Sequence, residues 1–146
     1  MTDITEEREP AELDEEPAPP QPDRVRRSTA EHVNQAIDRQ IERNVRRYAA
    51  SSPIVIHRRI RELDEEWDIE RVLEANASTL ALTGLVLGLT VHRKWVGLSA
   101  AVLFFLLQHS LQGWCPPLPL LRRLGVRTRG EIDREKYELE ALLENR

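Results

Sequence analysis

Residues 75–114 read ANASTLALTGLVLGLTVHRKWVGLSAAVLFFLLQHSLQGW, and this stretch decides the fold. It contains two bases, Arg93 and Lys94, and no acid, although 32% of the 146-residue chain is charged. The bases separate two uncharged segments, 75–92 and 95–114, which are 18 and 20 residues long. As helices they would measure about 27 Å and 30 Å, and the hydrocarbon core of a bilayer is roughly 30 Å thick. The stretch therefore predicts a two-helix transmembrane hairpin in an all-α membrane protein.

The residues that flank the two segments indicate an orientation. Trp95 and Trp114 bracket the second segment, as tryptophans at a membrane–water interface do. The turn carries two bases, whereas the outer flanks carry eight, which favours both termini in the cytoplasm. The eight are Arg58, Arg59, Arg61, Arg71, Arg122, Arg123, Arg127 and Arg129. The acidic N-terminus lacks the apolar core of a secretory signal, so we expect the hairpin to target a multi-pass protein to a bacterial inner membrane.

A soluble alternative stays open, in which the hairpin is buried inside a helical bundle or an oligomer. Outside residues 75–114 the apolar residues are sparse and lie in strongly charged segments, and aromatic residues make up only 5% of the chain. Little material is therefore available to cover such a hairpin. We expect the lipid bilayer to be its partner.

Small residues recur along both segments at four-residue spacing. They are Ala77, Ala81, Gly84 and Gly88 in the first segment and Gly97 and Ala101 in the second. Small faces let helix backbones approach closely in lipid. We expect these residues to pack the hairpin itself, and a homodimer contact is the open alternative.

Residues 1–27 are acidic and proline-rich, and they predict a disordered tail because they have little to bury.

Residues 28–74 predict charged amphipathic helices. The first, at 28–50, begins with the capping-box spacing of Ser28 and Glu31. Its apolar residues recur every three or four positions, at Val33, Ile37, Ile41, Val45 and Tyr48. Such a helix lies either on anionic lipid or on another helix, and the narrow stripe, without Trp or Phe, favours another helix.

A second charged helix is predicted to begin at Ser52 and Pro53, an N-cap followed by a first-turn proline. Its apolar stripe is Ile56, Ile60, Leu63 and Trp67. Five acids follow between Asp64 and Glu70, but no Glu-x-x-His pair of the kind that binds metal in helical bundles accompanies them. We expect them to pair with Arg58, Arg59, Arg61 and Arg71 along the same helix, and we expect neither a metal nor a cofactor.

Beyond Trp114, the prolines at 116, 117 and 119 are expected to stop the second membrane helix, so that the hairpin region spans residues 75–121. Residues 122–146 then predict a cytoplasmic C-terminal helix. Thr128 and Glu131 have capping-box spacing at its start. Its apolar residues, Ile132, Tyr137, Leu139, Leu142 and Leu143, are expected to be covered by the helix at 28–50.

Several short motifs of the hairpin occur together in a known family. They are GLVLGLTV at residues 84–91, LS at 98–99, GWCP at 113–116 and LL at 120–121. This pattern resembles the bacterial two-helix inner-membrane family of unknown function that includes the membrane part of YgaP-like proteins, in which Gly-aromatic-Cys closes the second helix. The resemblance covers about Ala75 to Thr128 and implies a membrane hairpin and a dimer, but no known reaction. The rhodanese domain of YgaP-like members is absent, so sulfurtransferase activity is not implied.

Few side chains suggest chemistry. Cys115, which follows the second helix, is the best candidate. Nearby arginines would favour its reactive thiolate, and acylation is a second possibility, but the expected role is that of a small residue packed at the helix end. Because it is the only cysteine, an internal disulfide is excluded. Gln108, His109 and Gln112 are polar residues within the second segment, where an interhelical hydrogen bond is the expected role.

Function is less well determined than location. The chain contains no phosphate-binding loop, dinucleotide fingerprint, nucleophile elbow or zinc-protease motif, so we do not expect an enzyme. The near-neutral charge of the segments after residue 23 argues against nucleic-acid binding. We therefore expect a membrane-anchored interaction or scaffold module. A thiol-dependent redox or sulfur-handling module built on Cys115, and a small oligomeric transporter or channel, remain as alternatives.

Overall fold

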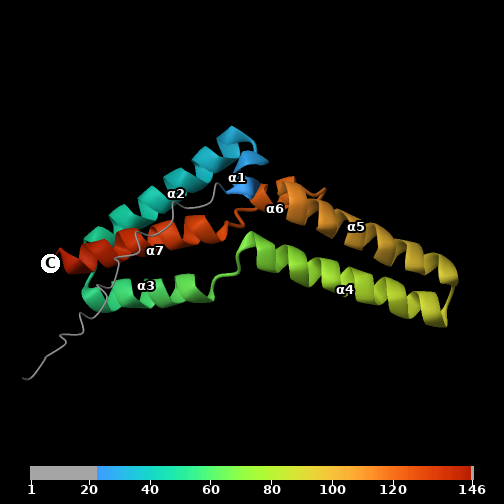
Figure 1. Cartoon of the computed structure of the whole chain (residues 1–146). Coiled ribbons are helices and arrows are strands. Elements are labelled where there is room, and N and C mark those ends of the chain that lie inside the picture. Colours follow the sequence, from blue (N-terminus) through green and yellow to red (C-terminus); the bar gives the residue numbers. More distant parts are fainter. Residues whose placement is uncertain (1–22, 146) are drawn as a thin grey trace, which may run out of the picture.

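The computed structural model describes residues 23–145, so the predicted disorder of residues 1–22 lies outside the described part (Figure 1). Within residues 23–145 every regular element is a helix. The elements are α1 (Arg24–Arg27), α2 (Glu31–Ala49), α3 (Pro53–Glu65), α4 (Ile69–Thr90), the 3-10 turn η1 (Arg93–Trp95), α5 (Val96–Gln112), α6 (Leu118–Arg123) and α7 (Arg129–Glu144).

The helices form two arms that meet at an elbow (Figure 1). One arm is a bundle in which α7 lies between α2 and α3 and packs against both. The other arm is a hairpin of α4 and α5, which pack along their length and are joined through η1. The short helices α1 and α6 lie at the elbow. The predicted hairpin and the predicted charged helices are therefore separate packing units of the fold.

The stripe predicted for the first charged helix is confirmed in α2. Val33, Ile37 and Ile41 are buried, and Val45 packs against them. The predicted Ser28–Glu31 capping box is wrong, because the N-cap is Ala30 and Ser28 instead terminates α1. The predicted tail is correspondingly too long, since residues 24–27 form α1, whose Asp23 cap accepts a hydrogen bond from the Arg26 N–H.

The core of the bundle lies between α3 and α7. It consists of Ile56, Leu63, Ile132 and Leu139, with Val45 and Tyr48 of α2 packed against it. The Thr128–Glu131 capping box at the start of α7 is confirmed, as is the packing of this helix against α2. Tyr137 does not join the core; it is 68% exposed.

The prediction that Trp67 continues the apolar stripe of α3 is wrong. The helix ends at Glu65, and Trp67 lies in the short link to α4, 51% exposed. Asp68 then caps α4 by accepting a hydrogen bond from the Arg71 N–H at 2.8 Å. Helix α4 thus begins at Ile69, more than one turn before the predicted start at Ala75.

The end of α5 is set by a glycine and not by the prolines. Gly113 adopts a φ of 72° and its N–H donates to the carbonyl of His109. This left-handed conformation favours glycine at the end of a helix. The proline-containing segment that follows is partly helical. Pro117 caps the short helix α6, which the sequence did not reveal and which carries the chain from the hairpin back to the bundle.

Candidate functional site

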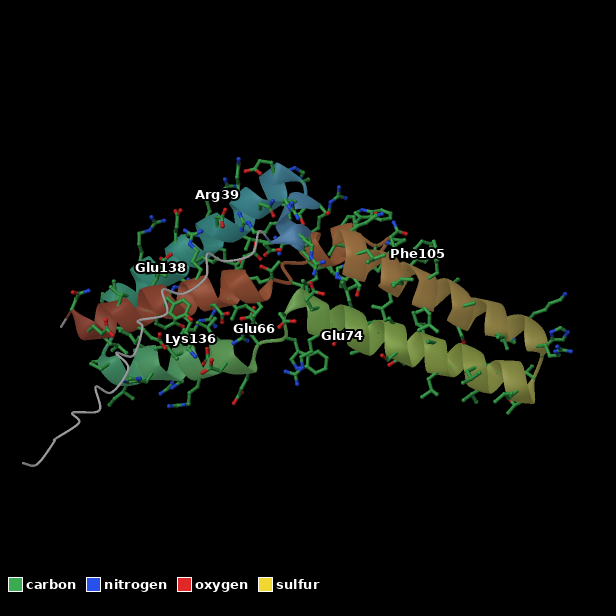
Figure 2. All side chains as sticks on the ribbon, viewed as in Figure 1. Arg39, Glu66, Glu74, Phe105, Lys136 and Glu138 are labelled. Atoms are coloured by element: carbon green, nitrogen blue, oxygen red, sulfur yellow. The ribbon has the colours of Figure 1, made fainter. Side chains whose placement is uncertain are left out.

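The hairpin arm presents its apolar side chains outward. Two stretches of the described chain are long and apolar enough to cross a membrane, Pro53–Thr90, whose apolar part is α4, and Arg93–Gln112. Leu82 and Leu89 of α4 are 62% and 78% exposed, and Phe104 and Leu111 of α5 are 62% and 69% exposed. A soluble core helix would bury these side chains. In Figure 2, Phe105 lies on the hairpin arm, as does Glu74 near the base of α4, whereas Arg39, Lys136 and Glu138 lie on the bundle.

The hairpin itself closes along a narrow seam. Gly84 and Gly88 are buried, and a Cβ at either position would meet α5 at 2.7 Å or less. Ser99 is buried opposite Gly84, and its Oγ donates to the carbonyl of Ala81 at 2.7 Å. Ala77 and Ala81 are half-buried in α4, whereas Gly97 and Ala101 are exposed. Gly84 therefore faces Ser99 and Gly88 faces Val96, two residues that the small-residue spacing did not single out.

Gly88→Ala should destabilise the hairpin, whereas Gly97→Ala should not. The new Cβ at residue 88 would lie 2.5 Å from Val96 Cγ2 and 3.2 Å from Val96 N, so the stiff valine and its backbone must move, whereas no atom lies within 4 Å at residue 97. Overpacking of this kind costs about 1–3 kcal/mol, and Ala otherwise favours a helix over Gly by about 1 kcal/mol. Thermal melts in detergent, followed by circular dichroism, measure both; equal melting temperatures would contradict the seam.

Tryptophans occur at both ends of the hairpin. Trp95 lies at the tip, beside Arg93 and Lys94, and Trp114 follows α5 at the base; they are 44% and 38% exposed. Trp67 adds a second ring at the base, because it closely precedes α4, and the Arg71 guanidinium lies 4.7 Å from its ring centroid. The sequence reading missed Trp67 as a candidate interfacial residue because it assigned this residue to a helix stripe.

The polar residues of α5 differ in burial and in partners. His109 is buried, and its Nε2 lies 2.9 Å from Oε2 of Glu70 on α4, the expected interhelical hydrogen bond. Its Nδ1 is buried without a hydrogen-bond partner. Gln108 is half-buried and Gln112 is exposed. The Glu70–His109 contact thus ties the first turn of α4 to the last turn of α5.

Cys115 is buried, with 4% of its surface exposed, in a cluster with Val25, Ile69, Leu73 and Leu118. Burial raises the pKa of this thiol above its usual range. The expected packing of Cys115 at the helix end is therefore confirmed, and the alternative of a thiolate favoured by neighbouring arginines is wrong. The Arg122 guanidinium turns toward Glu131 instead.

Cys115 should consequently react slowly with a maleimide at neutral pH. Burial raises the thiol pKa, and less thiolate is then present at a given pH, so the rate should climb only as the pH approaches the raised pKa. The comparison is Ser52→Cys in a Cys115→Ser background, because Ser52 is exposed. The native Cys115 should react more slowly than the exposed residue 52, and unfolding in SDS should remove the difference. Equal native rates would contradict the burial.

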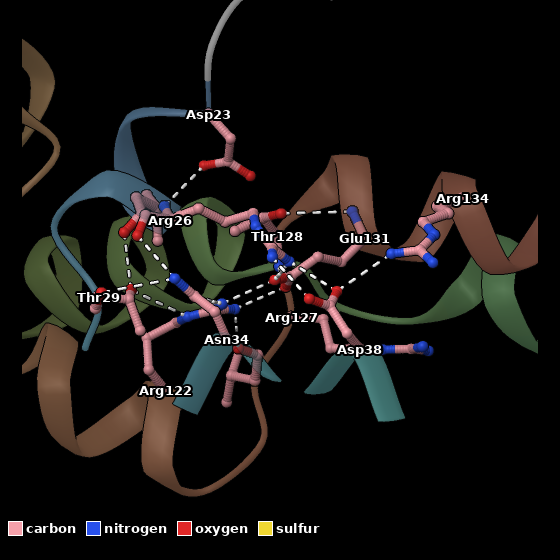
Figure 3. A network of polar contacts seen from close by, with 12 residues as sticks. Asp23, Arg26, Thr29, Asn34, Asp38, Arg122, Arg127, Thr128, Glu131 and Arg134 are labelled. Carbon is pink, nitrogen blue, oxygen red and sulfur yellow. Dashed lines mark hydrogen bonds and ion pairs between the residues drawn. The ribbon is translucent and has the colours of Figure 1, made fainter. Parts of the chain in front are cut away.

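A buried polar network joins the hairpin to the bundle (Figure 3). Arg122 of α6 is almost fully buried and donates two hydrogen bonds to the Glu131 carboxylate of α7, at 2.6 and 2.7 Å. It also donates to the Val126 carbonyl, to Asn34 of α2 and to Thr29 just before α2. Glu131 also accepts from Arg26 at 2.7 Å. One buried guanidinium thereby connects α6, α7 and α2.

Arg26 extends this network to α2. It forms a bidentate contact with Asp38, at 3.0 and 2.9 Å. This hydrogen bonding holds the pKa of Asp38 below its ordinary value. Arg134 of α7 contacts the same carboxylate at 3.2 Å.

A second network lies beside the entry to α4. Glu135 of α7 is fully buried and is paired with Arg127 and with Arg59 of α3, the latter at 2.9 Å. Arg127 also pairs with Glu66, at 2.5 Å, in the link before α4. The link before α4 is therefore fixed to the bundle through Glu66, and the segment after α5 is fixed to it through Arg122.

The predicted pairing of the acidic cluster within its own helix is mostly wrong. Only Glu62, just before the cluster, pairs along α3, with Arg59. Among the clustered acids, Asp64 pairs with Lys136, Glu66 with Arg127 and Glu70 with His109, each with a residue distant in the sequence. These carboxylates stabilise tertiary contacts, and residues 23–145 hold no group of three or more potential metal ligands.

Comparison with family models, with curated proteins and with solved structures finds no match for this chain.

Proposed function

We propose that the chain is an integral membrane protein of a bacterial inner membrane, in which the α4–α5 hairpin anchors a charged helical bundle at the cytoplasmic face as an interaction or scaffold module. The observation that carries this proposal is the outward direction of the apolar side chains on the hairpin. The exposed large apolar residues cluster on this arm, while the bundle has a conventional buried core. Such a surface is unfavourable in water and favourable in lipid.

The energetics support insertion. Each Leu, Ile, Phe or Val at the centre of a membrane helix contributes about −0.3 to −0.6 kcal/mol. The exposed residues of this kind are Leu80, Leu82, Leu85, Val86, Leu89, Val91, Val96, Leu103, Phe104, Phe105, Leu107 and Leu111. Summed over the hairpin, they outweigh the threonines of α4, whose hydroxyls each donate to a backbone carbonyl one turn earlier.

The dimensions of the hairpin also agree with a span. Helix α5 has 17 residues. At a rise of ~1.5 Å per residue, its length is about 26 Å. The part of α4 after Glu74 is of similar length. Both are slightly shorter than a hydrocarbon core of roughly 30 Å, a mismatch met by local thinning and by long side chains that reach the headgroups. Arg93 and Lys94 at the tip, and Arg71 beside Trp67 at the base, are placed for this.

The bundle supplies the interaction surface in this proposal. It lies at the arginine-rich end of the hairpin, which is the cytoplasmic side under the positive-inside rule. Its exposed faces are charged and mixed in sign. The resemblance of about residues 75–128 to the bacterial two-helix inner-membrane family agrees with an anchor and adds no reaction. A partner would be a second copy or another protein.

Topology labelling tests this proposal. In a Cys115→Ser background, Lys94→Cys places a thiol at the exposed tip and Arg39→Cys places one on an exposed face of α2. In intact cells with a permeable outer membrane, an impermeant maleimide should label residue 94 and should reach residue 39 only after the inner membrane is opened. A carbonate wash should leave both variants in the membrane. Release by carbonate would reject the anchor, and the reverse labelling pattern would reject the orientation.

A further inference from the structure

A cavity of about 370 Å³ lies at the base of the hairpin, between its two helices and α6. Ala77 and Leu80 of α4, Leu106 and His109 of α5, and Leu120 and Leu121 of α6 are among the residues that line it. Its wall is almost entirely apolar, and its volume lies in the range of small-molecule sites. Leu80 and Leu120 are 48% and 62% exposed, so the cavity is bordered by apolar surface.

The cavity has a polar end and an apolar end. Helix α4 runs from base to tip and α5 runs back, so the lining residues Asn76 and His109 lie toward the bundle, whereas Leu80 and Val102 lie deeper. The Nδ1 atom of His109 is buried and has no hydrogen-bond partner, and among the described residues it is the one side-chain polar atom of which this is true. A buried polar atom without a hydrogen-bond partner is destabilising, so the hydrogen-bonding capacity of His109 is incompletely satisfied in the protein alone.

We propose that this cavity binds one acyl chain of a phospholipid from the cytoplasmic leaflet, with the polar end of the lipid near His109. The proposal rests on the membrane anchor proposed above. The depth fits, because the cavity occupies the half of the hairpin next to the bundle. The polarity fits, because a lipid of that leaflet also has its polar end toward the cytoplasm and its alkyl chain deeper. The tail at residues 1–22 does not suit the site, since it is acidic and proline-rich.

Helix α6 forms part of the lipid-facing surface in this arrangement. Leu118 is fully buried and Arg122 lies in the polar network, whereas Leu120 on α6 and Leu124 just after it are 62% and 72% exposed. These leucines would lie at the level of the headgroups and glycerol, beside Trp114. The lipid would then contact the hairpin on one side and α6 on the other.

Native mass spectrometry of the full-length protein, extracted from membranes in mild detergent, tests the site. Leu80→Trp fills the cavity, whereas Leu82→Trp places the same ring on an exposed position outside it. Wild type and Leu82→Trp should retain a phospholipid adduct. Leu80→Trp should retain about tenfold less, because losing contact with two methylene groups already weakens binding about tenfold.

The outcomes separate this inference from the proposed anchor. Carbonate resistance and helical circular dichroism of both variants show whether each one still inserts and folds. An inserted wild-type protein without an adduct would overturn the lipid site alone, as would equal adduct levels on the two variants. A dimer in which Leu80→Cys cross-links to a second copy, without lipid, would assign the cavity to that copy instead. As a second variant, Val102→Phe also fills the cavity and should weaken the adduct if the site is correct.

Discussion

Arginine at residue 104 should remove most of the protein from the carbonate-resistant membrane fraction. Phe104 lies at the middle of α5 and is 62% exposed, so in a bilayer its side chain meets lipid. Arginine at the centre of a membrane helix costs about 2.5–3.5 kcal/mol on insertion scales, in addition to the lost contribution of the phenylalanine. Because every ~1.4 kcal/mol is tenfold, the inserted fraction of α5 should fall about a hundredfold relative to the uninserted form.

The matched control is Ile54→Arg. Ile54 is 75% exposed, but it lies on α3 in the bundle. Exposed substitutions away from special features change stability by about 0.5 kcal/mol or less, so this variant should remain in the membrane. If Phe104→Arg fractionates like Ile54→Arg, the hairpin is covered by protein or water and not by lipid, and the proposed anchor fails.

Arg122→Met should destabilise the bundle by about 3 kcal/mol, the lower end of the usual range for a broken buried ion pair. Removing one partner of such a pair costs about 3–5 kcal/mol, because the other charge stays buried and unpaired. The lower value applies here, since Glu131 keeps its contact with Arg26 and its bond from the Thr128 N–H. Denaturant unfolding in detergent, followed by circular dichroism, measures the loss.

Two further variants test the origin of this effect. Arg122→Met combined with Glu131→Gln should recover part of the stability, because the uncompensated charge is gone while the amide can still accept from the Thr128 N–H. Arg134→Met removes a guanidinium that is 47% exposed, and exposed pairs are worth about 0–1 kcal/mol. Equal losses for Arg122→Met and Arg134→Met would show that the network is not buried in solution.

The features that sequence analysis predicted well are those set by neighbours along the chain. The α2 stripe and the Thr128–Glu131 cap follow from helical periodicity and from a four-residue motif, and both are confirmed. The hydrophobic pattern at residues 75–114 likewise indicated two apolar helices, which the structure contains. Local rules succeed here because the interacting groups lie within one or two turns of each other.

The errors arise where distant residues compete for the same group. Ser28 fits a capping box by spacing, yet its hydroxyl donates to the Gln112 carbonyl and α2 begins without it. Glu66 lies within reach of arginines in its own segment, but Arg127, 61 positions away, binds it. The partners of Arg122 were equally invisible, because a buried ion pair between α6 and α7 leaves no periodic signal in the sequence.

The two networks at the elbow have a mechanical consequence. Arg127 holds the chain before α4 through a partly buried ion pair with Glu66, and Arg122 holds it after α5 through a buried ion pair with Glu131. Neither connection can therefore rotate freely without breaking an ion pair. A force applied to the bundle would therefore be transmitted as torque to α4 and α5 together. In the proposed membrane anchor, the angle between the two arms would set how far from the bilayer the bundle holds a protein bound to it.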